Sequence, residues 1–386
     1  MRSTGSLIVG AFEHPERRIR GRTVPEVLSE VCAGALDDAG LSIADVDGFF
    51  CSPDVPGFGS LAMAEYLGLG DLSYIDTTEG GGASYPMHVG HAAAAIAAGK
   101  CSVALVAMAG LPLSDPRRHA DASAPESPYE DALGIPVPAS YALAAMRHMH
   151  QFGTTGAQLA EVKVAASYHA QFNPHARLRR PVTVDEVLES PMVSDPLHRL
   201  DCCITTDGGG ALVVVSDDVA RALGRRGVRI SGHGEAFMHA IGGTLDLTTT
   251  GAARSGPRAY AEAGIGPADI DYASIYDSFT ITVLMSLEDL GFCDKGAGGQ
   301  FVSEGGLMAP YGALPVNTDG GGLCNNHPGY RGGMIRTIEA VRQLREEAAP
   351  EVQVPDCEWG LVQAHGYRLG SRSVSSTLIL GREDAR

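Results

Sequence analysis

Two short stretches of the first half of the chain recur in the second half, in the same order. AGLSIADVD at 39–47 returns as AGIGPADID at 263–271, and TEGGG at 78–82 returns as TDGGG at 318–322. The first pair places a helix end, a turn and a strand entry at corresponding points, although the helices ahead of these turns match only loosely. Chance can produce one short match, whereas two in register indicate an internal duplication. We therefore predict two similar halves.

The alternation of apolar runs predicts that these halves are α/β. In the first half, strands are expected at 6–12, 47–51, 74–77 and 102–109, and helices at 24–39, 61–67 and 84–98. The run at 102–109 is continuously apolar, as in a central strand covered on both faces. Helices between such strands indicate mixed sheets with buried helices.

Residues from about 110 to 200 interrupt this alternation. They carry many prolines and two expected helices, at 139–151 and 155–172, before the sheet resumes at 210–216. Long irregular insertions are more often functional than structural filler, so we expect this one to cover a ligand site. The predicted division is a first half at 1–225, which contains the insertion, and a second half at 226–386.

Composition excludes several classes of protein. The net charge of −17 disfavours nucleic acid and anionic membrane surfaces as partners, so an anionic ligand would need a local basic patch. Eight cysteines occur without C-x-x-C spacing, which argues against a zinc site or a disulfide framework and fits a reducing cytosol. The N-terminus enters a strand directly, and no apolar run approaches transmembrane length. These features predict a soluble cytoplasmic protein.

The stretch NTDGGGLCNNHPG at 317–329 is the most distinctive candidate for a functional site. Three consecutive glycines let the backbone bend freely and approach a ligand closely. His327 stands just ahead of a helix expected at 331–344, where backbone N–H groups favour negative charge. Taken alone, the stretch is equally consistent with a glycine-rich turn that carries an incidental imidazole.

Three blocks together resemble those of the thiolase superfamily. PVNTDGGG…HP at 315–328 resembles the P-x-N-x-x-G-G…G-H-P block, YDSF at 276–279 stands in place of N-E-A-F or H-D-C-F, and QAHGYRLG at 363–370 stands in place of C-x-G-G-G. The resemblance covers nearly the whole chain. It implies the thiolase fold, in which two pseudo-twofold-related βαβαβαββ halves form five layers, α-β-α-β-α.

Both cysteines on which thiolase catalysis depends are missing from these blocks. Gly82 falls where the nucleophilic cysteine should begin a helix, and no cysteine lies in the third block. Ser84 is a poor substitute, because a nucleophilic serine needs an adjacent base and an N-cap role explains this residue at no extra cost. We therefore expect no covalent acyl transfer through cysteine.

The resemblance assigns roles to several other residues. Tyr276 and His327 would donate hydrogen bonds to the thioester oxygen, with Tyr276 also a candidate for proton transfer. A tyrosine at a strand end is usually a core residue, and the family position is what favours a functional role here. His365 is the titratable group nearest the vacated base position, and a catalytic base and a structural imidazole are equally good interpretations of it. The remaining candidates are backbone N–H groups at Gly82 and Gly366, and, in second line, Tyr367 and Asp277.

A thiolase-like chain that lacks both cysteines and carries Tyr before Asp-x-Phe resembles the steroid side-chain aldolases. GFCDKG at 291–296 and LDCC…TDG at 200–208 support this, whereas His327 replaces a second tyrosine of those enzymes. The resemblance implies an acyl-CoA lyase that cleaves a β-hydroxyacyl-CoA by a retro-aldol step. The alternatives are a thiolase-like acyltransferase or condensing enzyme, and a non-catalytic scaffold subunit.

The resemblance also implies a set of ligands and partners. The CoA thioester would be the substrate, with no covalently bound cofactor and no metal. The protein would form a homodimer, often joined by a small companion with a zinc ribbon and an OB-fold that completes the CoA site.

Overall fold

The computed structural model describes residues 5–52, 59–115, 132, 136–239, 245–383 and 385. Two parts of the predicted insertion, 116–131 and 133–135, lie outside these residues. The strands and helices predicted in the first half are present, with ends within two residues of those expected. They are β1 (Ser6–Glu13), α1 (Val24–Ala39), β2 (Gly48–Cys51), α2 (Ser60–Leu67), β3 (Tyr74–Asp76), α3 (Ser84–Ala97), β4 (Val103–Gly110), β7 (Gly208–Ser216) and α8 (Asp217–Leu223).

The second half contributes a corresponding set of elements. They are β8 (Val228–Met238), α9 (Ala252–Ala263), β9 (Tyr272–Ile275), α10 (Thr280–Asp289), α11 (Gly298–Val302), α12 (Gly332–Leu344), β10 (Trp359–Tyr367) and β11 (Ser373–Arg382). The two turns that repeat in the sequence behave alike, since Gly40 closes α1 and Gly264 closes α9, both with left-handed backbone angles.

The order of the strands is symmetric about the centre of one nine-stranded sheet. The order is β3-β2-β4-β7-β1-β8-β11-β10-β9, with β1 and β8 paired antiparallel where the two halves meet. Beyond β9, Val316 forms a parallel bridge to Ala273 and so takes the place that β3 has in the first half. This mirrored order agrees with the internal duplication read from the sequence.

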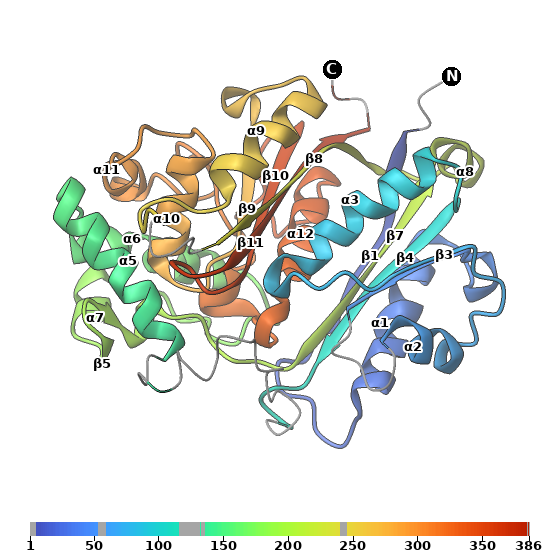
Figure 1. The fold of residues 1–386 in the computed structure, drawn as a ribbon, viewed down its shortest axis with the longest axis horizontal. Coiled ribbons are helices and arrows are strands. Elements are labelled where there is room, and N and C mark those ends of the chain that lie inside the picture. Colours follow the sequence, from blue (N-terminus) through green and yellow to red (C-terminus); the bar gives the residue numbers. More distant parts are fainter. Residues whose placement is uncertain are drawn as a thin grey trace.

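Helices α3 and α12 lie between the two halves (Figure 1), and both contact strands of each half. Val89 of α3 and Ile335 of α12 share one buried cluster with Val106 of β4 and Val362 of β10. On the outer faces, α1 packs on β1 and β7, and α9 packs on β8 and β11. The result is the α-β-α-β-α layering expected, because each half of the nine-stranded sheet forms one β layer and is covered on both faces.

The described part of the insertion packs against the second half. It comprises α5 (Val137–Phe152), α6 (Gly156–Ala170), α7 (Val184–Leu188), β5 (Met192–Ser194) and β6 (Leu197–His198). Tyr141 and Ala145 of α5 share a buried cluster with Phe279 and Leu284, just beyond the end of β9 (Figure 1). The insertion therefore lies beside the Tyr-Asp-Ser-Phe block. Within the described ranges, no helix has the length and apolar character needed to cross a membrane.

Candidate active site

The three sequence blocks meet at one edge of the sheet. Tyr276 follows β9, and β10 runs parallel beside it, so both strands end on the same side. The first glycine loop reaches this place from β3, because a Cβ atom on Gly82 would lie 2.2 Å from the carbonyl oxygen of His365 and 2.5 Å from the Tyr276 ring. Real Cβ atoms do not approach that closely. Position 82 therefore has no room for a cysteine in this backbone.

The start of α12 completes the convergence. A Cβ atom on Gly332 would lie 2.9 Å from the Tyr276 ring and 3.3 Å from His327, and one on Gly333 would lie 2.2 Å from the carbonyl oxygen of Gly82. The rings of Tyr276 and His327 meet edge to face, with centroids 5.3 Å apart. Glycines thus bring a phenol, an imidazole and the vacated nucleophile position together at a helix N-terminus, where a negative charge is favoured.

Burial sets the protonation states of the two rings. It raises the pKa of Tyr276 well above the ordinary value, while the backbone N–H of Gly332 acts in the opposite direction. It lowers the pKa of His327 to about 4. Both side chains are therefore neutral near pH 7. The Nε2 atom of His327 is buried and has no hydrogen-bond partner in the described part of the chain, so it is able to form a hydrogen bond with a ligand.

Asp277 orients the second glycine loop. Its carboxylate accepts hydrogen bonds from the backbone N–H groups of Gly322 (2.7 Å) and Leu323 (3.0 Å). His327 is fixed from the other side, since its own backbone N–H donates to the Thr206 hydroxyl at 2.8 Å. Asp277 thus holds the loop that carries His327.

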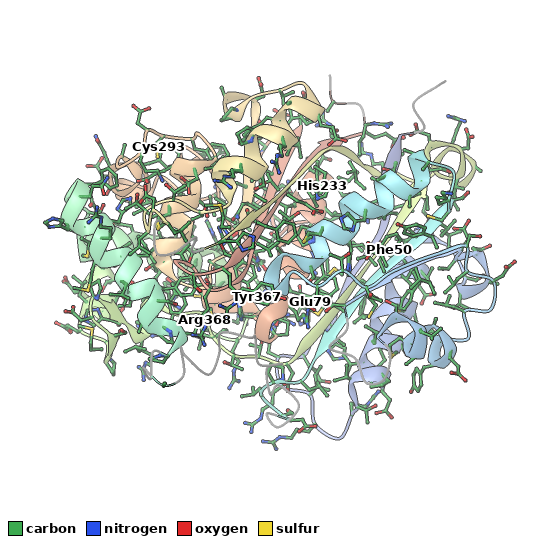
Figure 2. The ribbon with its side chains drawn as sticks, in the orientation of Figure 1. Phe50, Glu79, His233, Cys293, Tyr367 and Arg368 are labelled. Atoms are coloured by element: carbon green, nitrogen blue, oxygen red, sulfur yellow. The ribbon has the colours of Figure 1, made fainter. Side chains whose placement is uncertain are left out.

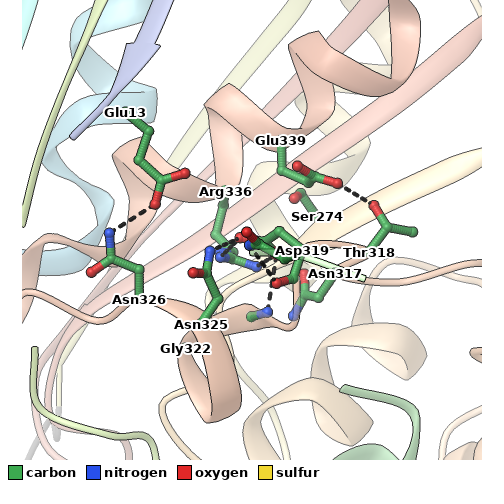
Figure 3. Close-up of polar contacts among 12 residues, drawn as sticks. Glu13, Ser274, Asn317, Thr318, Asp319, Gly322, Asn325, Asn326, Arg336 and Glu339 are labelled. Atoms are coloured by element: carbon green, nitrogen blue, oxygen red, sulfur yellow. Dashed lines mark hydrogen bonds and ion pairs between the residues drawn. The ribbon is translucent and has the colours of Figure 1, made fainter. Parts of the chain in front are cut away.

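A buried ion pair joins this loop to α12 (Figure 3). Both Asp319 oxygens accept hydrogen bonds from Arg336, at 2.8 and 2.7 Å, and both side chains are almost fully buried. Asp319 also accepts from the Gly321 N–H (2.9 Å) and the Asn325 amide (2.7 Å). Sequence reasoning missed this pair, although the repeat of an acidic residue before three glycines was a usable signal.

Glu79 plays the same part in the first glycine loop. It accepts from the N–H of Gly81 at 2.6 Å, as Asp319 does from Gly321, and it pairs with the buried Arg331 just ahead of α12. Ser84 is also tied into this loop, because its hydroxyl accepts from Gly80 (2.9 Å) and donates to the Gly81 carbonyl (2.9 Å). The N-cap role predicted for Ser84 is therefore wrong.

His365 occupies the opposite face of the sheet from Tyr276. Strand β10 continues through this block to Tyr367, so its side chains alternate between the two faces of the sheet. Ala364 faces Gly333 at the start of α12, which turns His365 outward, where its Nε2 contacts Gln363 (2.8 Å) and Ser286 (3.1 Å). Burial lowers the pKa of His365 to about 4. Its carbonyl, and not its imidazole, borders the site.

The last two candidates of the third block lie beside the first glycine loop. A Cβ atom on Gly366 would lie 1.7 Å from the Gly80 carbonyl, so this backbone approach also requires glycine. Tyr367 is half exposed and lies near Glu79 (Figure 2), and partial burial together with the charge of Glu79 raises the pKa of the Tyr367 phenol.

Two residues near Tyr276 were missed by sequence reasoning. Tyr141 of α5 stacks on Phe279 with centroids 4.3 Å apart, and Cys203 donates its backbone N–H to Ser278 at 2.9 Å. Both lie near enough to affect the pKa of Tyr276. Burial raises the pKa of Cys203, so it stays a thiol and is a poor nucleophile. In the sequence, Cys203 counted only as part of the LDCC stretch, and its place near Tyr276 depends on the fold, which brings it from a distant segment.

Comparison with known proteins identifies the class. Residues 234–382 match the family described as "Thiolase C-terminal domain-like". The chain is 33% identical to an acetyl-CoA acetyltransferase of Methanothermobacter thermautotrophicus, with 90% of this chain and 93% of that protein covered. It is 35% identical to a steroid side-chain-cleaving aldolase of Thermomonospora curvata, with 87% and 89% covered. The chain therefore belongs to the thiolase superfamily.

A solved structure narrows the comparison. The structure of the Ltp2-ChsH2(DUF35) aldolase has a TM-score of 0.87 and 32% identity, and the match covers 99% of this chain and 98% of that one. The resemblance and the fold predicted from the three blocks are both confirmed. Within the described residues, no group of three or more His, Cys, Asp or Glu side chains could hold a metal ion.

Proposed function

We propose that the protein is an acyl-CoA aldolase that cleaves a β-hydroxyacyl-CoA, with a steroid side-chain thioester as the leading substrate class. One observation carries the proposal. The position that matches the thiolase nucleophile is a glycine without room for a side chain, since a Cβ atom there would lie 2.5 Å from the Tyr276 ring. A site that cannot form an acyl-enzyme but keeps polar groups for a thioester suits a lyase. The aldolase names of two similar proteins support it.

The reaction is balanced without a co-reactant. A base takes the proton of the β-hydroxyl, and the electrons of that O–H bond form the new C=O bond. The electrons of the Cα–Cβ bond move into the thioester to give an enolate. A proton delivered to Cα then releases a shorter acyl-CoA beside a ketone or an aldehyde.

The neutral states of the two rings suggest how they share this work. Tyr276 keeps its proton, so it can donate a hydrogen bond to the enolate oxygen and then supply the proton for Cα. A well-placed donor at such an oxygen contributes about 3 kcal/mol. The unpartnered Nε2 of His327 is placed to contact the same thioester or to receive the β-hydroxyl proton. Backbone N–H groups of Gly82 and Gly366 would complete the oxyanion site.

We do not propose His365 as the catalytic base, although the sequence left that role open for it. Its imidazole faces Ser286 and Gln363 on the other side of the sheet. A proton transfer from the substrate would have to cross β10.

A thiolase-like acyltransferase or condensing enzyme is the second candidate. The similarity to an acetyl-CoA acetyltransferase favours it, but such an enzyme would have to work without the acyl-enzyme that Gly82 precludes. A scaffold subunit would give no role to the buried Nε2 of His327, which has no hydrogen-bond partner among the described residues.

We further propose that the protein acts in the cytoplasm as a homodimer, with the CoA thioester as substrate and without a bound cofactor. A small companion with a zinc ribbon and an OB-fold would complete the CoA site. The solved aldolase, whose name pairs Ltp2 with ChsH2(DUF35), supports a companion of this kind.

The proposal is tested by incubating the protein with branched β-hydroxyacyl-CoA esters, alone and with any zinc-ribbon protein encoded beside it. We expect a shorter acyl-CoA and a carbonyl compound to form without free CoA. A strict requirement for free CoA would indicate thiolysis instead. Binding without turnover, even with the companion present, would indicate a scaffold.

A further inference from the structure

Four arginines occupy six positions, RRIRGR at 17–22, in a chain whose net charge is −17. The segment connects β1 to α1. Strands β1 and β4 both run antiparallel to β7, and β3 is parallel to β2 and β4, so β1, β3 and β4 end at one edge of the sheet. The arginines are therefore on the edge from which the Gly82 loop emerges.

These arginines differ in whether their side chains already have partners within the protein. Arg17 is buried and bound to Glu13 and Asn325, and Arg22 pairs with Glu30. Arg18 and Arg20 are exposed, and neither forms an ion pair with a carboxylate of the described residues. Among the described residues, these two guanidinium groups have no carboxylate partner, so they can bind an external anion.

The free arginines line a cavity of about 290 Å³. Arg18, Arg20 and Arg22 form one wall, and the loop after β4 forms the other with Leu111, Ser114 and Asp115. Because Arg22 is paired with Glu30, two uncommitted guanidinium groups, those of Arg18 and Arg20, line the cavity with the single carboxylate of Asp115. The balance is positive in a molecule that is otherwise strongly acidic.

Asp207 fixes both walls of this cavity. Its carboxylate accepts from the backbone N–H groups of Ile19 (2.8 Å), Leu113 (2.9 Å) and Ser114 (3.0 Å). The preceding residue, Thr206, holds the backbone of His327. Two consecutive residues, Thr206 and Asp207, therefore hold His327 and the walls of the arginine cavity. The cavity thus lies next to the candidate active site.

We propose that this arginine cavity binds the phosphate groups of the CoA ester. The inference rests on the proposed use of a CoA thioester as substrate. Guanidinium groups match phosphate oxygens in bidentate pairs, and CoA carries a pyrophosphate and a ribose phosphate. An acidic protein repels such a ligand unless a local positive site offsets the repulsion. An acidic segment of a companion protein is the competing occupant.

The test compares Arg18→Gln/Arg20→Gln with Arg221→Gln, which alters an exposed arginine on α8. Calorimetry measures the binding of CoA, dephospho-CoA, pantetheine, inorganic phosphate and the companion protein. We expect the double variant to bind CoA about tenfold or more weakly, because two charge-assisted contacts are lost. Pantetheine binding should stay unchanged, dephospho-CoA should lose less than CoA, and Arg221→Gln should behave as the unaltered protein.

Equal CoA affinity in the double variant would overturn the proposal, and so would an equal loss for pantetheine. Inorganic phosphate binding that the variant abolishes while CoA binding is retained would mark the cavity as a free anion site. Loss of companion binding alone would assign the cavity to an acidic partner surface. Because binding is measured without turnover, a protein that binds CoA here but cleaves no ester would contradict the proposed function and leave this inference standing.

Discussion

At the scale of single residues, the site is defined as much by what is missing as by what is present. Gly82 removes the nucleophile, and the space it leaves is filled by Tyr276 and the carbonyl of His365. His327 remains from the thiolase pattern, but its Nε2 has no partner among the described residues. We therefore expect the reaction to depend on hydrogen bonding and proton transfer and not on covalent catalysis.

Tyr276→Phe removes one hydroxyl from a buried ring and leaves the packing almost unchanged. We expect turnover to fall about a hundredfold or more, because an oxyanion donor is lost, while the melting temperature stays close to that of the unaltered protein. Tyr260→Phe is the matched control, since the Tyr260 hydroxyl is buried and has no hydrogen-bond partner within the described residues. Similar turnover in both variants would place the site elsewhere.

Gly82→Cys restores the residue type of the thiolase nucleophile. We expect it to yield no acyl-enzyme and to destabilise the protein by about 1–3 kcal/mol, because the new Cβ atom would overlap the His365 carbonyl. Urea unfolding gives the stability, with Gly70→Ala as the control in open space. A stable Gly82→Cys variant with thiolase activity would refute this account of the glycine.

His327 should make folding sensitive to acid. The folded protein keeps it neutral to about pH 4, whereas a histidine of the unfolded chain is protonated near pH 6.5. The unfolded state therefore binds more protons between these values, and stability falls as the pH falls. The cost is about 1 kcal/mol per pH unit, so the gap in unfolding free energy between the unaltered protein and His327→Gln should narrow or invert from pH 7 to pH 5. The exposed His175→Gln variant is the comparison, and a gap independent of pH would argue against a buried neutral ring.

At the scale of elements, the same arrangement of side-chain contacts holds each of the two glycine loops. An acidic residue before three glycines accepts the N–H two positions further on and pairs with an arginine at or near α12. These contacts attach both loops to the central helix layer, which α3 and α12 form. The internal repeat in the sequence therefore extends to the contacts that hold the two glycine loops.

Arg336→Met would leave the carboxylate of Asp319 buried without a counter-charge. We expect a loss of about 3–5 kcal/mol of unfolding free energy, the usual cost of breaking a buried ion pair from one side. Arg180→Met, which breaks an exposed pair with Glu186, should cost no more than about 1 kcal/mol. If both variants lost the same unfolding free energy in urea, burial would not determine how much the Asp319–Arg336 pair contributes to stability.

At the scale of the whole molecule, the internal repeat and the apolar runs were enough to predict two α/β halves, and the three blocks predicted the layering. Tyr276, His327, Gly82 and Gly366 meet as the blocks suggested. The face of the sheet on which the His365 side chain lies could not be predicted from the sequence. It depends on β10 continuing beyond residue 362, and a shift of one residue along a strand moves every side chain to the other face. Tyr141 and Cys203 reach the site only through tertiary packing, which no local pattern encodes.

The most direct test of the account is a mass balance over a single turnover. The protein is mixed with a limiting amount of a β-hydroxyacyl-CoA ester, in the absence of free CoA, and both products and intact protein are weighed by mass spectrometry. The account predicts equal amounts of the shorter acyl-CoA and the carbonyl product, with the protein mass unchanged. An acyl adduct on the protein, or no cleavage until free CoA is added, would contradict it.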